Sequence, residues 1–102
     1  MTPADAFRLA TVGGASVLNR PELGRIEAGQ AADLVLYNGN DVALAGAVAQ
    51  DPLAALLLCL APRPERVIVN GKTVLNAGHF AGFDAAKAAA DFNQLVRKHF
   101  RR

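Results

Sequence analysis

Histidine is the residue most often used for metal or acid–base chemistry, and this chain has two, His79 and His99. A hydrolytic metal centre needs several histidine and carboxylate ligands around one ion, with a position left open for water. The two histidines are twenty residues apart, and neither belongs to an H-x-H or H-x-x-x-H pair. We expect His79 on a surface loop and His99 in the basic end of a helix, where its charge favours the helix dipole. The sequence therefore predicts no metal ligand in this chain.

The candidate nucleophiles also lack activating neighbours. Ser16 has no histidine nearby and no G-x-S-x-G pattern around it. Cys59 lies in an apolar run without a charged neighbour, so we expect a buried, inert thiol. The glycines do not have the spacing of a phosphate-binding loop. We predict no catalytic and no substrate-binding residue.

Asp33 has the most suggestive position among the acids, because it directly precedes a predicted strand. A carboxylate there can accept hydrogen bonds from backbone N–H groups of the preceding turn. We assign Asp33 this structural role rather than a catalytic one. The other residues that we single out as structural are Gly24, Gly29, Asn70 and Gly71.

The composition describes a small and unusually apolar body. A chain of 102 residues buries only about 60 to 70% of the surface that its unfolded form exposes. Hydrophobic residues nevertheless make up 52% of it before its nine glycines are counted, against about 45 to 50% with glycine in ordinary domains. We expect the chain to cover part of its surface with another polypeptide or with a second copy of itself.

Charge and cysteine content exclude several classes of protein. The net charge is +2, and the basic cluster near the C-terminus complements a helix dipole without a second basic patch for nucleic acid. No apolar run approaches the roughly 18 residues that span a bilayer. One cysteine cannot form an intrachain disulfide, which fits a reducing compartment. These features predict a cytoplasmic protein that contacts neither nucleic acid nor membrane.

Local patterns predict a helix first and a strand after it. Thr2-Pro3-Ala4-Asp5 combines a cap, a proline at the first helical position and the acid of a capping box. Gly13-Gly14 should interrupt that helix and let another backbone approach closely, before a short turn over residues 15–18. A turn-rich stretch then leads into a strand over residues 32–37, which Asn38-Gly39-Asn40 closes.

The second half contains the clearest local signal. Asn70-Gly71 separates two β-branched runs, 66–69 and 72–75, which is typical of a hairpin with a type I′ turn. Before it, apolar stretches over 42–49 and 53–60 are separated by Asp51 and Pro52, the cap and first residue of a helix, and Pro62 and Pro64 close the segment. Asp84 should cap a final helix whose apolar face comprises Ala85, Ala88, Ala89, Phe92, Leu95, Val96 and Phe100.

Three segments, in this order, resemble the end of an amidohydrolase-superfamily enzyme. Residues 9–18 resemble the helix after the last barrel strand. Residues 23–36 resemble the L-G-x-I-x-x-G-x-x-A-D-L start of the small β-domain, and residues 67–74 resemble the hairpin that follows it. The stretch 44–56 is similar, more particularly, to 8-oxoguanine deaminase and hydroxyatrazine ethylaminohydrolase. The resemblance covers nearly the whole chain but only about the last quarter of such an enzyme.

The resemblance implies a fold and an arrangement of segments. The fold class is α+β: a small sheet with the Asn-Gly hairpin, the C-terminal part of a composite β-sandwich, flanked by an N-terminal and a C-terminal helix and without a barrel. Residues 1–22 would be the helical segment after the barrel, 23–80 the β-domain segment with an intervening helical stretch, and 81–102 the C-terminal amphipathic helix. We expect these to form one compact unit.

The resemblance also implies a function that the chain cannot carry alone. The parent enzyme would use Zn or Fe to activate water for hydrolytic deamination of a purine or triazine, and this chain would be its inactive scaffold, with no cofactor of its own. Its partner would be the missing barrel, or a second copy through apolar faces. The alternatives are a stand-alone, non-catalytic binding or oligomerisation module and, third, an independent small enzyme.

Overall fold

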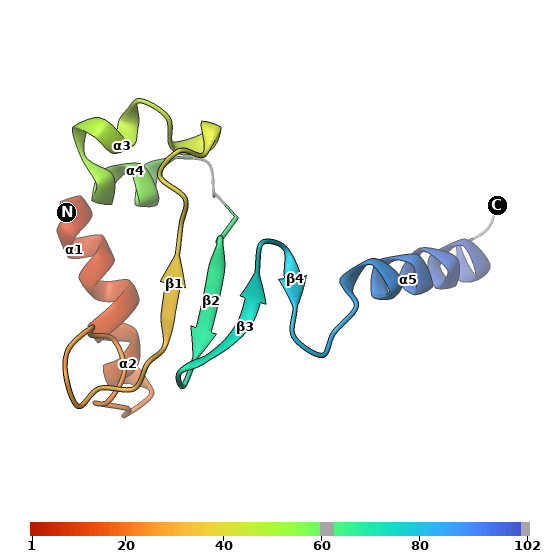
Figure 1. Ribbon diagram of the computed structural model, residues 1–102, viewed down its shortest axis with the longest axis horizontal. Coiled ribbons are helices and arrows are strands. Elements are labelled where there is room, and N and C mark those ends of the chain that lie inside the picture. Colours follow the sequence, from red (N-terminus) through yellow and green to blue (C-terminus); the bar gives the residue numbers. More distant parts are fainter. Residues whose placement is uncertain (60–62, 101–102) are drawn as a thin grey trace.

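The computed structural model describes residues 1–59 and 63–100, and a four-stranded antiparallel sheet organises them (Figure 1). The strands stand in sequence order, β1-β2-β3-β4, and no barrel closes in the described part of the chain. Helices lie beside β1 at one end of the sheet, and a long helix follows β4 at the other end. The predicted class of a small sheet with helices and no barrel is confirmed. The strands are β1 Leu34–Leu36, β2 Arg66–Val69, β3 Lys72–Asn76 and β4 His79–Phe80.

The N-terminal helix begins where the sequence predicts. In α1, Pro3–Arg8, the Thr2 hydroxyl accepts a hydrogen bond from the Asp5 N–H at 3.2 Å, and the Asp5 carboxylate accepts one from the Thr2 N–H at 3.0 Å. This reciprocal pair satisfies two backbone donors that a helix start leaves unpaired. The capping box is therefore confirmed.

The predicted interruption at Gly13-Gly14 is wrong. Helical backbone continues from α1 through a π-turn, Leu9–Gly13, into α2, Gly14–Val17. A glycine inside a helix costs only about 1 kcal/mol relative to alanine, so packing can keep the helix intact. The helical run ends beyond Leu18, at Asn19, which has a positive φ of 55°.

The segment between β1 and β2 is helical, but in shorter pieces than the apolar runs predicted. Gly46, at φ 80°, divides the first run into a 3-10 turn, Val42–Leu44, and α3, Ala47–Gln50. The second run forms α4, Pro52–Leu58, where the Asp51 carboxylate caps the helix by accepting from the Ala54 N–H at 3.1 Å. The predicted end of this segment, at Leu60 and Pro62, lies outside the described residues.

Two tight turns connect the last three strands. Asn70 and Gly71 join β2 to β3 with φ values of 50° and 79°, the positive pair that a type I′ turn needs. Ala77 and Gly78, at 49° and 84°, make a second such turn between β3 and β4. Because of that second turn His79 lies in a short strand, and its predicted loop position is wrong.

The core is very small, and the described chain is extended. Only Ala15, Leu44 and Ala55 are buried apolar residues in the described part of the chain. The Cα radius of gyration is 17.5 Å, against about 13 Å for a compact domain of 100 residues. Cys59, predicted to be buried, is only half-buried.

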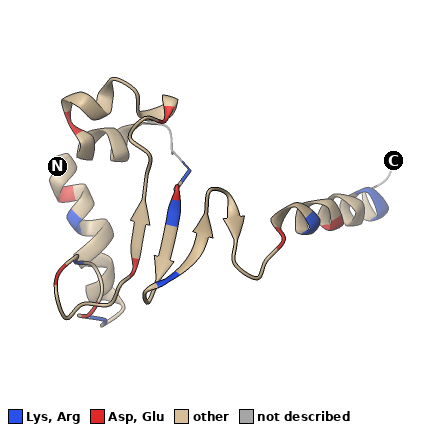
Figure 2. Cartoon of the chain, viewed as in Figure 1, with Lys and Arg blue, Asp and Glu red and all other residues tan. Residues whose placement is uncertain are grey.

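The extended shape comes from the final helix. α5, Ala85–His99, starts at the predicted cap, where the Asp84 carboxylate accepts from the Lys87 N–H at 3.0 Å, and it extends away from the sheet (Figure 1). The acidic cap Asp84 precedes the helix, Lys87 and Asp91 alternate along its first half, and Arg97 and Lys98 lie in its last turn (Figure 2). Within residues 1–59 and 63–100, no helix is long and apolar enough to cross a membrane.

Candidate functional site

Two hydrogen bonds, both donated by the hairpin turn, join it to the start of β1. The Asp33 carboxylate accepts from the Asn70 N–H at 2.8 Å, and the Ala32 carbonyl accepts from the Gly71 N–H at 2.9 Å. We call this pair the Asp33 clasp. It joins Asp33 to a residue 37 positions away, so the predicted donor, the preceding turn, is wrong. One structural feature therefore unites two patterns that are separate in the sequence, Ala32-Asp33 and Asn70-Gly71.

Gly24 marks a second place where two segments meet. A Cβ on Gly24 would lie 2.9 Å from the Thr11 carbonyl oxygen and 3.0 Å from the Val12 Cα, and its φ is +91°. The close backbone approach that Gly13-Gly14 was expected to allow therefore occurs at Gly24. Gly29, at φ +89°, has open space around its missing side chain. Position 24 therefore requires glycine, because any side chain would meet both the positive φ and the close backbone contact.

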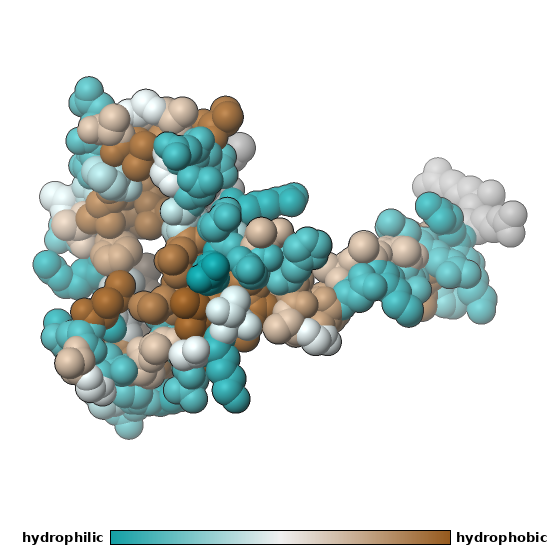
Figure 3. All heavy atoms as spheres, in the orientation of Figure 1, coloured by the Kyte–Doolittle hydropathy of each residue, from teal (hydrophilic) through white to brown (hydrophobic). Residues whose placement is uncertain are grey.

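An apolar groove of about 900 Å³ lies between α1, α4 and β1. We define the apolar groove by Phe7, Leu34, Tyr37, Leu53 and Leu57, which line it. Phe7 and Tyr37 are 40% and 38% exposed, although both belong to types that usually pack inside a protein. Figure 3 shows hydrophobic residues gathered around the hollow between the helices and the sheet. Its lining combines apolar side chains with fewer polar ones and includes no histidine among the described residues.

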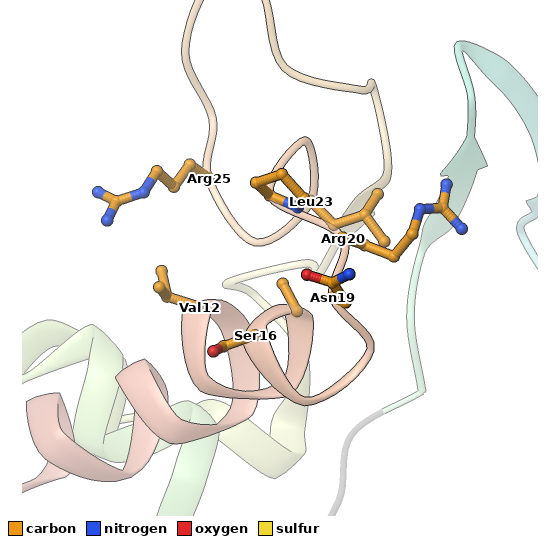
Figure 4. A pocket seen from close by; sticks show the side chains of 8 residues that line it. Val12, Ser16, Asn19, Arg20, Leu23 and Arg25 are labelled. Atoms are coloured by element: carbon orange, nitrogen blue, oxygen red, sulfur yellow. The ribbon is translucent and has the colours of Figure 1, made fainter.

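A smaller pocket of about 280 Å³ lies at the C-terminal end of α2. Ser16 and Asn19 line it together with Arg20 and Arg25, whose guanidinium groups point in opposite directions away from the pocket (Figure 4). Arg20 is ion-paired with Glu22, and its hydrogen bond lowers the pKa of that carboxyl. No histidine or carboxylate lines the pocket, so Ser16 has no base there.

The metal-ligating residue types are scattered. His79 is exposed in β4, and His99 is exposed at the end of α5. No three His, Cys, Asp or Glu side chains among the described residues form a group that could hold a metal ion. A hydrolytic zinc or iron site needs such a group, so the residues present do not fit that cofactor.

Comparisons with known proteins identify the family of the chain. A sequence model of the amidohydrolase family matches residues 1–74. The chain belongs to the amidohydrolase family. Residues 75–102, which include α5, lie outside the matched range. Both the Asp33 clasp and the Gly24 contact lie within it.

Two relatives and two solved structures narrow the position of the chain within the amidohydrolase family. It is 39% identical over 90 residues to 8-oxoguanine deaminase of Pseudomonas aeruginosa, covering 88% of this chain and 20% of the relative. It is 32% identical over 96 residues to hydroxydechloroatrazine ethylaminohydrolase of Pseudomonas sp. strain ADP, covering 94% and 20%. The predicted resemblance to this deaminase and aminohydrolase group is confirmed.

The solved structures are of atrazine chlorohydrolase from Arthrobacter aurescens. One is a mutant complexed with zinc and atraton, and the other is complexed with zinc. Each matches with a TM-score of 0.81 and 30% identity, covers 94% or 93% of this chain, and has 21% of its own length covered. The chain thus spans about a fifth of the length of these amidohydrolases.

The structure adds one relation that sequence reasoning missed within this amidohydrolase segment. The type I′ turn at Asn70-Gly71 was predictable, but the partner of its Asn70 N–H was not, because it comes from residue 33. The signal for this hydrogen bond would have been the combination of an Asp directly before one strand with an Asn-Gly turn directly after the next strand.

Proposed function

We propose that this chain is the C-terminal scaffold portion of a metal-dependent amidohydrolase that hydrolytically deaminates a nitrogen heterocycle, 8-oxoguanine or a related purine or triazine. On this proposal the chain alone is inactive. The observation that carries it is the 39% identity to 8-oxoguanine deaminase over a fifth of that enzyme's length, in a segment whose described residues hold no group of metal ligands.

The metal and its ligands would then belong to the remaining four-fifths of the enzyme. The Arthrobacter chlorohydrolase structures are complexes with zinc. We expect zinc or iron in the parent of this chain. The metal would supply an activated water to the ring carbon that carries the amine. No residue of this chain is assigned to that step.

The contribution of this chain would be mechanical support. The three buried apolar residues in the described part of the chain form too small a core for a domain of this length, while the apolar groove leaves Phe7 and Tyr37 exposed and its leucines half-buried. We propose that the barrel of the parent enzyme covers the groove. The Asp33 clasp would hold β1 to the β2–β3 turn, and the Gly24 contact would hold the segment before β1 against the π-turn Leu9–Gly13, in the relative positions that the barrel requires.

An exchange of segments tests this proposal. The aligned segment of the Pseudomonas aeruginosa 8-oxoguanine deaminase is replaced by this chain, and ammonia release from 8-oxoguanine is measured with the purified hybrid. We expect the hybrid to be active, the deaminase without the segment to be inactive, and this chain with added zinc to be inactive. A hybrid with the stability and bound metal of the parent but without activity would contradict the deaminase assignment. Ammonia release by the chain alone would contradict the scaffold role.

A second function is favoured by the uncovered apolar surface itself. The chain could be a stand-alone, non-catalytic module that binds a partner or assembles with itself through that surface. This alternative predicts that the purified chain is monodisperse and unfolds cooperatively without the barrel. The scaffold proposal predicts a broad, weakly cooperative transition that becomes sharp in the hybrid.

A further inference from the structure

Helix α5 has an apolar face that no other described element covers. All of its residues are exposed except Ala88 and Val96, which are half-buried. Phe92 is 66% exposed and Leu95 is 56% exposed, although the helix is well formed over 15 residues. Such a helix needs a partner for this face, because an amphipathic helix gains most of its stability by packing.

The apolar residues have the spacing of a two-helix seam. Successive positions on the face are alternately three and four residues apart, which is the a/d pattern of paired helices. We call this set the α5 seam. Its apolar members are Ala85, Ala88, Phe92 and Leu95, and His99 occupies the next position of the same spacing.

The two flanks of the seam differ in chemistry, and this difference selects the partner and its direction. With 3.6 residues per turn, Asp91 and Lys98 lie on one flank, and Ala89 and Val96 lie on the other. In an antiparallel pair related by a two-fold axis, each flank meets the same flank of the other copy. In a parallel pair, the charged flank would meet the apolar flank instead.

We propose that α5 pairs antiparallel with α5 of a second copy of this chain. With Phe92 opposite Leu95 of the second copy, Asp91 faces Lys98 of that copy, and the symmetry repeats this ion pair. On the other flank, Ala89 faces Val96 of the second copy, so apolar meets apolar. The Asp84 cap of each helix also lies toward the basic last turn of the other, which contains Arg97 and Lys98 (Figure 2).

The monomer already holds one of these groups in a defined place. The Lys87 ammonium donates to the Asp91 carboxylate at 2.7 Å, one helical turn away. The Asp91 carboxylate has further acceptor positions on its two oxygens, so Lys98 of a second copy can bind it without displacing Lys87. The α5 seam is therefore self-complementary: apolar side chains meet apolar ones, and each acidic side chain meets a basic one.

The size of the seam sets the strength of the association. A helix of 15 residues is about 22 Å long, and the exposed parts of Phe92, Leu95 and their neighbours supply about 400 Å² per copy. Two copies bury about 800 Å², less than the roughly 1,200 Å² of stable specific interfaces. We therefore expect a reversible dimer in the micromolar range. This inference does not depend on the deaminase proposal, since it rests on residues beyond the family match.

Complementary charge reversals test the pairing. Sedimentation equilibrium of the full chain is measured from about 5 to 200 μM for the wild type, for Asp91→Lys and for Lys98→Asp, and circular dichroism confirms that each is helical. Either single variant places like charges together twice, so its dimer should be about tenfold weaker or more. An equimolar mixture of the two variants restores both ion pairs and should dimerise like the wild type.

Matched controls separate this pairing from general effects of charge. Asn93→Lys and Arg97→Asp change charge at neighbouring positions away from the Asp91 flank, and they should leave the dimer within about threefold of the wild type. A helical wild-type chain that stays monomeric at 200 μM would overturn the proposal. So would a mixture no more dimeric than its components, or a dimer equally sensitive to the control variants.

Discussion

Replacing Asp33 by alanine should loosen the sheet by an amount that the Asp33 clasp determines. The carboxylate accepts the Asn70 N–H at 2.8 Å, and a hydrogen bond to a charged group contributes about 1.5 to 3 kcal/mol. Asp33 and Asn70 are both exposed, so water can replace the lost partner, and we expect a loss of about 1 to 1.5 kcal/mol. For a chain of this length that loss lowers the melting temperature by about 4 to 12 °C.

The assay compares three variants by urea unfolding and by hydrogen exchange of the Asn70 amide. Asp33→Asn keeps a neutral acceptor and should lose about half as much stability as Asp33→Ala. Asp91→Ala, measured below the micromolar range in which the proposed dimer forms, removes an exposed carboxylate that in the monomer bonds only to Lys87, and it should cost less than about 0.5 kcal/mol. The reasoning is refuted if Asp33→Ala unfolds at the same urea concentration as Asp91→Ala and the Asn70 amide exchanges at its wild-type rate.

Two further predictions concern the glycines and the first helix. Gly24→Ala should destabilise the chain by about 2 to 4 kcal/mol for two reasons. The new Cβ would lie 2.9 Å from the Thr11 carbonyl oxygen, and alanine is strained at the positive φ of this position. Gly29→Ala meets the φ penalty alone and should cost about 1 kcal/mol, so equal midpoints in urea for the two would contradict this account. The hydrogen bonds from Thr2 lower the pKa of Asp5 below its usual 3.8, so its contribution is present above pH 4 and is lost as the pH falls below that value. The stability difference between wild type and Asp5→Ala should therefore shrink between pH 6 and pH 2.5, and a difference that stays constant over this range would show that the capping carboxylate is not its source.

Local sequence patterns predicted the features whose causes are local. The Thr2 to Asp5 capping box, the Asp51 and Asp84 caps and the positive φ values of Asn70 and Gly71 each depend on residues within three positions of one another. Their hydrogen bonds form almost independently of the remainder of the fold, so the pattern is sufficient evidence for the structure.

The features that sequence reasoning missed depend on distant parts of the chain. The donor to Asp33 lies 37 residues away, and the backbone that Gly24 approaches belongs to the first helix. Gly13-Gly14 has the composition of a break, yet the helix passes through it as a π-turn. His79 was placed on a loop because Ala77-Gly78 is a weak turn signal, and alanine at positive φ is uncommon. The position of α5 relative to the sheet was not predictable for the same reason, because no residue within α5 determines it.

The Asp33 clasp has a consequence for how this segment can change during evolution. The chain leaves the sheet at Leu36 and returns at Glu65, whose N–H donates to the Leu36 carbonyl at 2.7 Å. This bond joins the two ends of the excursion over residues 37–64, while the clasp joins the far ends of β1 and β2. The excursion contains α3, α4 and the buried Leu44 and Ala55. Among its described residues, its length can therefore change only in the turn before the 3-10 helix, over residues 38–40, where closure entropy grows slowly with length. A single-residue change of length at 32–34 or 69–71 would instead move the clasp out of register.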